Sequence, residues 1–124
     1  ELKRYFSADS CNSEQGKQYI RQAFEGGYLM DPHTATCLKA HDSGRDKPLP
    51  DIVYSTAEWT KFSPTIARAL TGEKDSHDID ALRSIADTAS TPIPPMIEAL
   101  FVRPVAQDTV IDKQDIEREV LAFI

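Results

Sequence analysis

The chain has 124 residues, of which 40% are hydrophobic, and a formal net charge of -6 with an isoelectric point near 5.0. This length fits one domain that buries roughly two-thirds of its unfolded surface. The acidic balance argues against a nucleic-acid partner, because such binding relies on clustered Lys and Arg. The residues show no export signal or long apolar run, so we expect no membrane partner and a cytoplasmic location.

A first helix is predicted over residues 13–25. Asn12 and Gln15 have the spacing of a capping box, and Gly26 with Gly27 supplies the end. Apolar residues recur at helical spacing between these signals: Tyr19, Ile20, Ala23 and Phe24. The local signals therefore fix both ends of this helix.

A second helix is predicted to begin at Pro32, whose missing N–H costs nothing there, with Asp31 as its cap. This structural role accounts for Asp31 without a catalytic one. His33, Cys37 and His41 would follow on one helix face, but eight residues span about 12 Å and zinc–ligand bonds are about 2 Å. We therefore predict no metal site, and we expect Cys37 to pack in the core, as free cysteines often do.

One strand is predicted at residues 51–56, after the turn-rich segment 43–50, because "IVY" is typical of a buried strand. Its one candidate partner is the short extended "YLM" at residues 28–30, and an unpaired strand leaves its N–H and C=O groups unsatisfied. The sequence therefore predicts an α/β class from which most of the sheet is missing. An exposed strand edge at residues 52–55 should favour self-association.

The rest of the chain is predicted to be helical. Ser63 and Pro64 indicate the cap and start of a third helix that ends at Gly72. Asp112 is expected to cap a final helix. The apolar stripes of the last three helices are Ile79, Leu82, Ile85, Ala86 and Ala89, then Met96, Ile97, Leu100 and Phe101 after the "TPIPP" break, then Ile116, Val120 and Phe123.

Two segments carry a resemblance to a known family. "GGYLMDPHTATCLKAH" followed by "DIVYSTAEWTKFSPTIARALTG" resembles the C-terminal portion of threonine synthase, whose chains carry a GYLxDPHTA segment and then an STAHPAKF segment. The tail, "IPPMIEALFVRPVAQDTVIDKQDIEREVLAFI", resembles the end of that family. The resemblance covers residues 13–124. Together with the absence of an initiator Met, it implies that residues 1–124 are the C-terminal portion of a longer chain.

The resemblance implies a helix-rich fragment with one or two short strands, completing the large cofactor domain of a fold-type II pyridoxal-phosphate enzyme. That family converts O-phosphohomoserine and water to threonine and phosphate, through a Schiff base with a lysine. Neither that lysine nor the glycine-rich loop for the cofactor phosphate is recognisable here, since Lys61 matches the family's KF lysine. No catalytic residue is therefore assigned in this chain. Its expected partner is the remainder of its own chain, without which it should be inactive.

The resemblance implies a cofactor-binding role for Thr56, together with Ser55. In this fold type a hydroxyl at the end of a late strand hydrogen-bonds the pyridine nitrogen. A hydroxyl, unlike a carboxylate, does not hold a proton on the ring, so the cofactor is a tempered electron sink. The alternative is that both hydroxyls only satisfy backbone groups where the strand ends.

His33, Glu58 and Lys61 are the candidates for positions near the substrate. His33 belongs to the DPHTA segment, and its alternative role is that of a helix-start residue bonded to a local carbonyl. Glu58-Trp59-Thr60 replaces the family's His-Pro-Ala, exchanging a titratable base for an acid. Trp59 is expected to pack against neighbouring helices.

Two other functions stay open. A stand-alone helical interaction module without catalysis would present an apolar groove to a partner; it explains the helix-rich tail but explains the DPHTA and STA segments poorly. A degenerate relative would have lost catalysis. An upstream cofactor domain in the gene would exclude the module, and absence of its lysine would indicate the degenerate relative.

Overall fold

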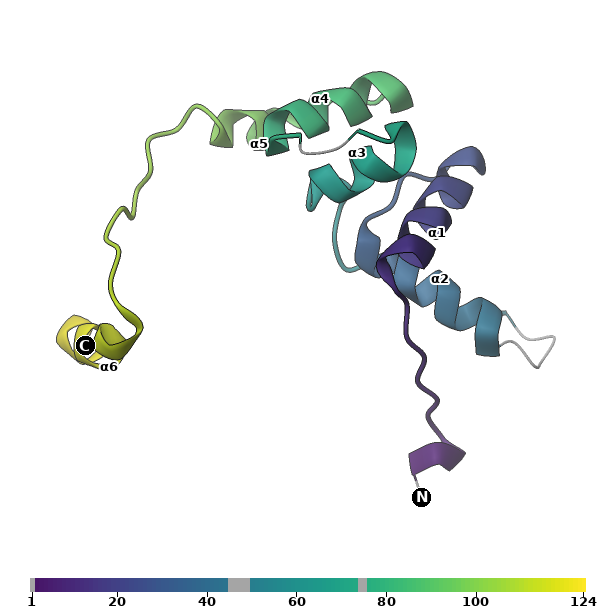
Figure 1. The fold of residues 1–124 in the computed structure, drawn as a ribbon, viewed down its shortest axis with the longest axis horizontal. Helices are drawn as coiled ribbons and strands as arrows, with labels where there is room; N and C mark the ends of the chain where they lie inside the picture. The colour runs from purple at the N-terminus through teal and green to yellow at the C-terminus, as the bar shows by residue number, and fades with distance from the viewer. Residues whose placement is uncertain (1, 45–49, 74–75) are drawn as a thin grey trace.

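The computed structural model describes residues 2–44, 50–73 and 76–124 (Figure 1). Its helices are α1 (Ser13–Glu25), α2 (Pro32–Gly44), α3 (Ser63–Thr71), α4 (Asp78–Ala89), α5 (Pro95–Leu100) and α6 (Ile116–Phe123), with short 3-10 helices at Leu2–Arg4 and Lys113–Asp115. Helices α1 to α4 lie together, whereas α6 lies away from them at the end of an extended arm. Within the described ranges no helix is long and apolar enough to cross a membrane.

Helix α1 has the predicted bounds. The Gln15 backbone N–H donates to Asn12 Oδ1 at 2.9 Å, and the Asn12 N–H donates to Gln15 Oε1 at 3.0 Å, which completes the capping box. The helix ends before Gly26, and Gly27 then takes a φ of 87°, which favours glycine. Both signals are local in sequence, and the prediction is confirmed.

Helix α3 starts differently from the prediction. Phe62, and not Ser63, is the cap residue, and it lies in the left-handed region with φ 60° and ψ 32°. Ser63 is already helical and buried, and its hydroxyl donates to the backbone oxygen of Asp78 at 3.1 Å. The hydroxyl therefore joins the starts of α3 and α4 instead of capping its own helix. Gly72, with φ 79°, ends α3 as predicted.

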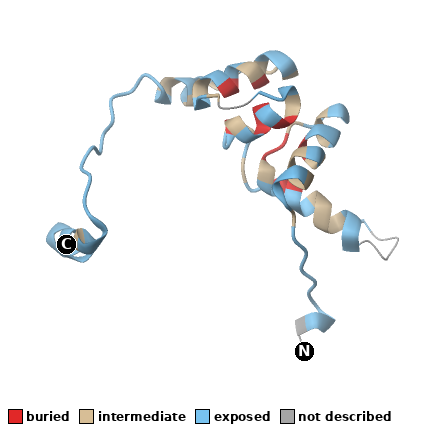
Figure 2. Ribbon diagram, in the orientation of Figure 1, coloured by how far each residue is buried: buried red, intermediate tan, exposed pale blue. Residues whose placement is uncertain are grey.

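A small core lies between α1, α2, α3 and α4, where Figure 2 shows the buried positions. Ile20 from α1, Ile66 from α3 and Ile85 from α4 are each at most 1% exposed. Four alanines are fully buried beside them: Ala35, Ala67, Ala69 and Ala81. Trp59 is half-buried and packs against this core, which confirms the predicted packing role.

Helices α5 and α6 form where the apolar stripes predicted them, but much of their apolar surface is uncovered. Met96 on α5 is 75% exposed and Phe123 on α6 is 93% exposed. Asp112 precedes a 3-10 turn, and its side chain makes no capping hydrogen bond. Among the described residues, the one element in substantial contact with α6 is that adjoining turn. The last helix therefore has no core of its own.

The predicted strand at residues 51–56 is absent, and the described part of the chain contains no strand, "YLM" included. Ile52 is 81% and Tyr54 is 77% exposed, so the segment is not buried either. The physical reason is that a strand exists only with a neighbour to pair its backbone groups, and none is available here. Most of the predicted turn at 43–50 lies outside the described residues.

The prediction for Cys37 is wrong, because this residue is exposed. Helix α2 turns the side chains of Thr34 and Ala35 inward, and both are buried. His33 and Cys37 lie on its outward side. The position of Cys37 on the helix, and not the usual burial of free cysteines, decides its exposure.

Candidate functional site

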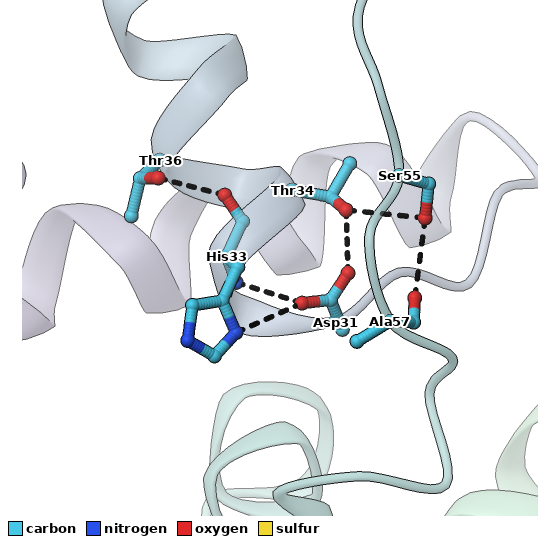
Figure 3. Close-up of polar contacts among 6 residues, drawn as sticks. All are labelled: Asp31, His33, Thr34, Thr36, Ser55 and Ala57. Atoms are coloured by element: carbon cyan, nitrogen blue, oxygen red, sulfur yellow. Dashed lines mark hydrogen bonds and ion pairs between the residues drawn. The ribbon is translucent and has the colours of Figure 1, made fainter.

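The site is the place where the DPHTA segment meets the segment that leads into α3 (Figure 3). Asp31 is fully buried immediately before α2. Its Oδ1 accepts the backbone N–H of His33 at 2.9 Å, which is the predicted capping bond, and lies 3.1 Å from His33 Nδ1. Its Oδ2 accepts the hydroxyl hydrogen of Thr34. Three donors in one turn therefore converge on a single carboxylate.

Thr34 extends these contacts to Ser55, which is 21 residues further along the chain. Thr34 Oγ1 lies 3.2 Å from Ser55 Oγ, and Ser55 Oγ lies 3.2 Å from the carbonyl oxygen of Ala57. A threonine hydroxyl has one hydrogen, and the contact with Asp31 uses it. Ser55 therefore supplies the hydrogen toward Thr34 or toward Ala57. The network fixes the corner at residues 55–57 against the start of α2.

The charge of Asp31 is set by two opposed effects. Burial alone would raise the pKa of this carboxyl, but the hydrogen bonds from Thr34 and His33 outweigh burial and hold the pKa below its ordinary value. The carboxylate is therefore ionised at neutral pH. It also lies at the start of α2, where the helix dipole favours negative charge.

His33 is held from two sides but stays accessible. Its Nδ1 faces Asp31, and its ring centroid lies 4.9 Å from that of Phe62 at an interplanar angle of 57°. The side chain is 60% exposed. With a carboxylate beside Nδ1, a neutral imidazole carries its hydrogen there and leaves Nε2 as an acceptor. His33 is thus a fixed, accessible base or ligand-binding group.

The other predicted site residues lie beside this network without joining it. Thr56, Glu58 and Lys61 are exposed, and their side chains make no hydrogen bond to any described residue. The backbone N–H of Lys61 donates to the Glu58 carbonyl at 3.0 Å, so these two residues belong to the turn before α3. The structure therefore unites Ser55 with His33 through Asp31 and Thr34, and leaves Thr56 with a free hydroxyl among the described residues.

Sequence reasoning missed Thr34 and Phe62. Thr34 stands three residues after the capping Asp31, and this spacing could have marked a side-chain contact across the first helical turn. Nothing in the sequence indicates that Phe62 would adopt positive φ, which is uncommon for a bulky residue. No group of three possible metal ligands exists within the described ranges, and His41 Nδ1 instead lies 2.7 Å from Asp51 Oδ2.

Comparison with known proteins gives a partial relationship. The chain is 33% identical over 109 residues to threonine synthase-like 1 of Macaca fascicularis and 33% identical over 104 residues to that of Mus musculus. It is 32% identical over 109 residues to threonine synthase-like 1 of Homo sapiens. The chain is related to threonine synthase-like proteins. The matches cover 87%, 83% and 87% of this chain, but the chain spans 14% of the length of each relative. No protein-family profile matches it.

Proposed function

We propose that this chain is the C-terminal part of a pyridoxal-phosphate-dependent threonine synthase, which converts O-phosphohomoserine and water to threonine and phosphate. In this proposal it completes the large cofactor domain of a fold-type II enzyme and is inactive without the rest of its chain. The relationship to threonine synthase-like proteins supports the family. The carrying observation is the Thr34–Ser55 contact, which joins the two segments that resemble threonine synthase.

The corner at residues 55–57 fits the pyridine ring of pyridoxal phosphate in its donor chemistry. Ser55 is engaged by Thr34 and Ala57, whereas the Thr56 hydroxyl is exposed and has no hydrogen-bond partner among the described residues. Thr56 would therefore hydrogen-bond the ring nitrogen, while Ser55 would hold the corner in place. When bound, the cofactor supplies an electron sink for carbanion chemistry. A neutral hydroxyl would leave the ring nitrogen without a proton of its own.

His33, Glu58 and Lys61 would line the substrate side of this corner. Asp31 orients His33, so that Nε2 can accept a proton or a hydrogen bond from the substrate. Lys61 supplies positive charge suited to a substrate phosphate, and Glu58 supplies a carboxylate where the family commonly has histidine. The chain's own groups would thus bind and orient the substrate, and the covalent lysine would come from upstream.

A second candidate is a helical interaction module without catalysis. The observation that favours it is the arm after α5, where Val102 is 84% and Val110 is 94% exposed. A module would use such apolar surface to bind a partner. It leaves unexplained why two segments that resemble threonine synthase should meet at the buried hydroxyl of Thr34.

The deciding experiment compares the product of the parent gene with this 124-residue chain by intact mass spectrometry and visible absorption. We expect a longer parent that absorbs as a bound pyridoxal-phosphate Schiff base, and a colourless fragment. A colourless parent no longer than this chain would overturn the proposal and favour the interaction module. A longer, colourless parent without a Schiff-base lysine would identify a degenerate relative.

A further inference from the structure

A pocket of about 370 Å³ opens where the first turns of α1 and α3 meet the start of α2. Its volume is within the range of small-molecule sites. None of the residues at the Ser55–Thr56 corner lines it, and His33 does not line it either. Pro32 and Thr36 contribute the α2 side of the wall. The pocket is thus a neighbour of the proposed cofactor corner and separate from it.

The charge of the pocket is opposite to that of the chain. Lys17 and Arg68 line it, and none of its described lining residues is Asp or Glu, although the chain as a whole carries a net charge of -6. Lys17 Nζ is paired with Glu14 Oε1 at 2.5 Å, but the Glu14 side chain is 83% exposed. An exposed pair of this kind is weak, so an anion within the pocket can compete for the ammonium group.

The remaining lining combines hydroxyl groups with an apolar surface. Ser13 and Thr65 bring hydroxyls from α1 and α3, whereas the Thr36 hydroxyl on α2 donates its one hydrogen to the carbonyl oxygen of His33 at 2.7 Å. Pro32 and Pro64, both half-buried, provide the apolar surface, whereas Ile20 is only 1% exposed and adds almost none. Two cations and two hydroxyls suit a group with many acceptor oxygens, and a phosphate dianion meets that description better than a carboxylate. The apolar surface suits a short hydrocarbon portion next to the phosphate.

We propose that this pocket is a binding site for a small organic phosphate. Lys17 and Arg68 bind the phosphate oxygens, and the hydrocarbon portion of the ligand packs on Pro32 and Pro64. The inference does not rest on the proposed function, because every residue it uses belongs to the pocket and none to the cofactor corner. Either proposal can therefore fail without the other.

The test is a titration of the 124-residue chain with n-butyl phosphate, inorganic phosphate and n-butanol, followed by NMR at the backbone amides of Gly16, Ile20 and Thr65. Saturable shifts are expected with both phosphates and none with butanol. Butyl phosphate should bind about tenfold more tightly than inorganic phosphate, as expected when about two methylene groups become buried. Shifts spread over the whole surface, or equal affinity for the two phosphates, would overturn the proposal.

Matched variants assign the binding to the pocket. Lys17→Gln should weaken butyl phosphate binding by about tenfold or more through loss of a charge-assisted hydrogen bond. Lys39→Gln removes the same charge from a lysine paired with Asp9 outside the pocket, and should leave the affinity within about twofold. Glu14→Gln keeps the pocket intact and releases Lys17, so it should strengthen binding by about twofold. Equal losses in Lys17→Gln and Lys39→Gln, or weaker binding in Glu14→Gln, would contradict the assignment.

Discussion

The hydroxyl of Thr34 donates its hydrogen to the buried carboxylate of Asp31 and in turn contacts Ser55. Asp31→Ala should therefore destabilise the chain by about 3 kcal/mol, because it leaves the Thr34 hydroxyl and the His33 N–H without their acceptor. Urea unfolding measures this change. Asp80→Ala, in an exposed pair with Arg83, is the matched control and should cost less than about 1 kcal/mol. Equal effects of the two substitutions would show that the buried network contributes no more to stability than an exposed ion pair does.

The lowered pKa of Asp31 predicts a direction for acid sensitivity. The ordinary value is 3.8 and the folded value lies below it, so the ionised carboxylate stabilises the fold above that pH. This stabilisation is lost as the pH falls from about 4 through the folded pKa. The free energy of unfolding should therefore decrease over that range, and Asp31→Asn should make the decrease shallower.

Asp9 gives an internal comparison for that measurement. The Lys39 hydrogen bond lowers its pKa to about 2, and its side chain is 30% exposed, whereas that of Asp31 is fully buried. Salt should therefore screen the contribution of Asp9 more than that of Asp31. Urea unfolding at several pH values, with and without about 0.5 M salt, separates the two. An acid dependence that disappears entirely in salt would rule out Asp31 as its source.

In the proposed full-length enzyme, Thr56→Val should remove the proposed ring-nitrogen partner while keeping the side-chain shape. Turnover should fall by a factor on the order of ten to a thousand, with a shifted cofactor absorption band. Ser55→Ala disturbs the corner without removing that partner. It should therefore lower the free energy of unfolding and change the cofactor absorption band little. Unchanged turnover and an unchanged spectrum in Thr56→Val would exclude the role.

The isolated chain is expected to self-associate. Ile52 and Tyr54 expose apolar β-favouring side chains on a backbone that has no strand partner among the described residues. Sedimentation velocity should show a mass that rises with concentration, and Ile52→Lys with Tyr54→Lys should reduce it. A single monomeric species at every concentration would contradict strand pairing as the mechanism.

The features that sequence predicted correctly are those specified within one or two helical turns. The capping box at Asn12 and the glycines after Glu25 define α1, and the caps and prolines set the start of α2 in the same way. The strand at 51–56 failed because its formation requires a partner elsewhere in the chain. Its sequence pattern alone cannot supply one.

The sequence predicted some of the residues that form the candidate site, but not the contacts that link them. The resemblance pointed to His33 and Ser55, which the structure links through Asp31 and Thr34. That link joins residues 21 positions apart, so no local pattern could reveal it. The position of Ser63 depended in the same way on its distant bond to Asp78. Long-range contacts account for the main differences at these positions.

The four buried alanines restrict how this part of the protein can change over generations. Ala35, Ala67, Ala69 and Ala81 have no exposed surface at all, so a larger side chain at any of them would push neighbouring helices apart. Descendant sequences should therefore retain small residues there while their outward faces drift freely. Among related sequences, conservation in this group of helices should therefore be highest at its smallest buried residues.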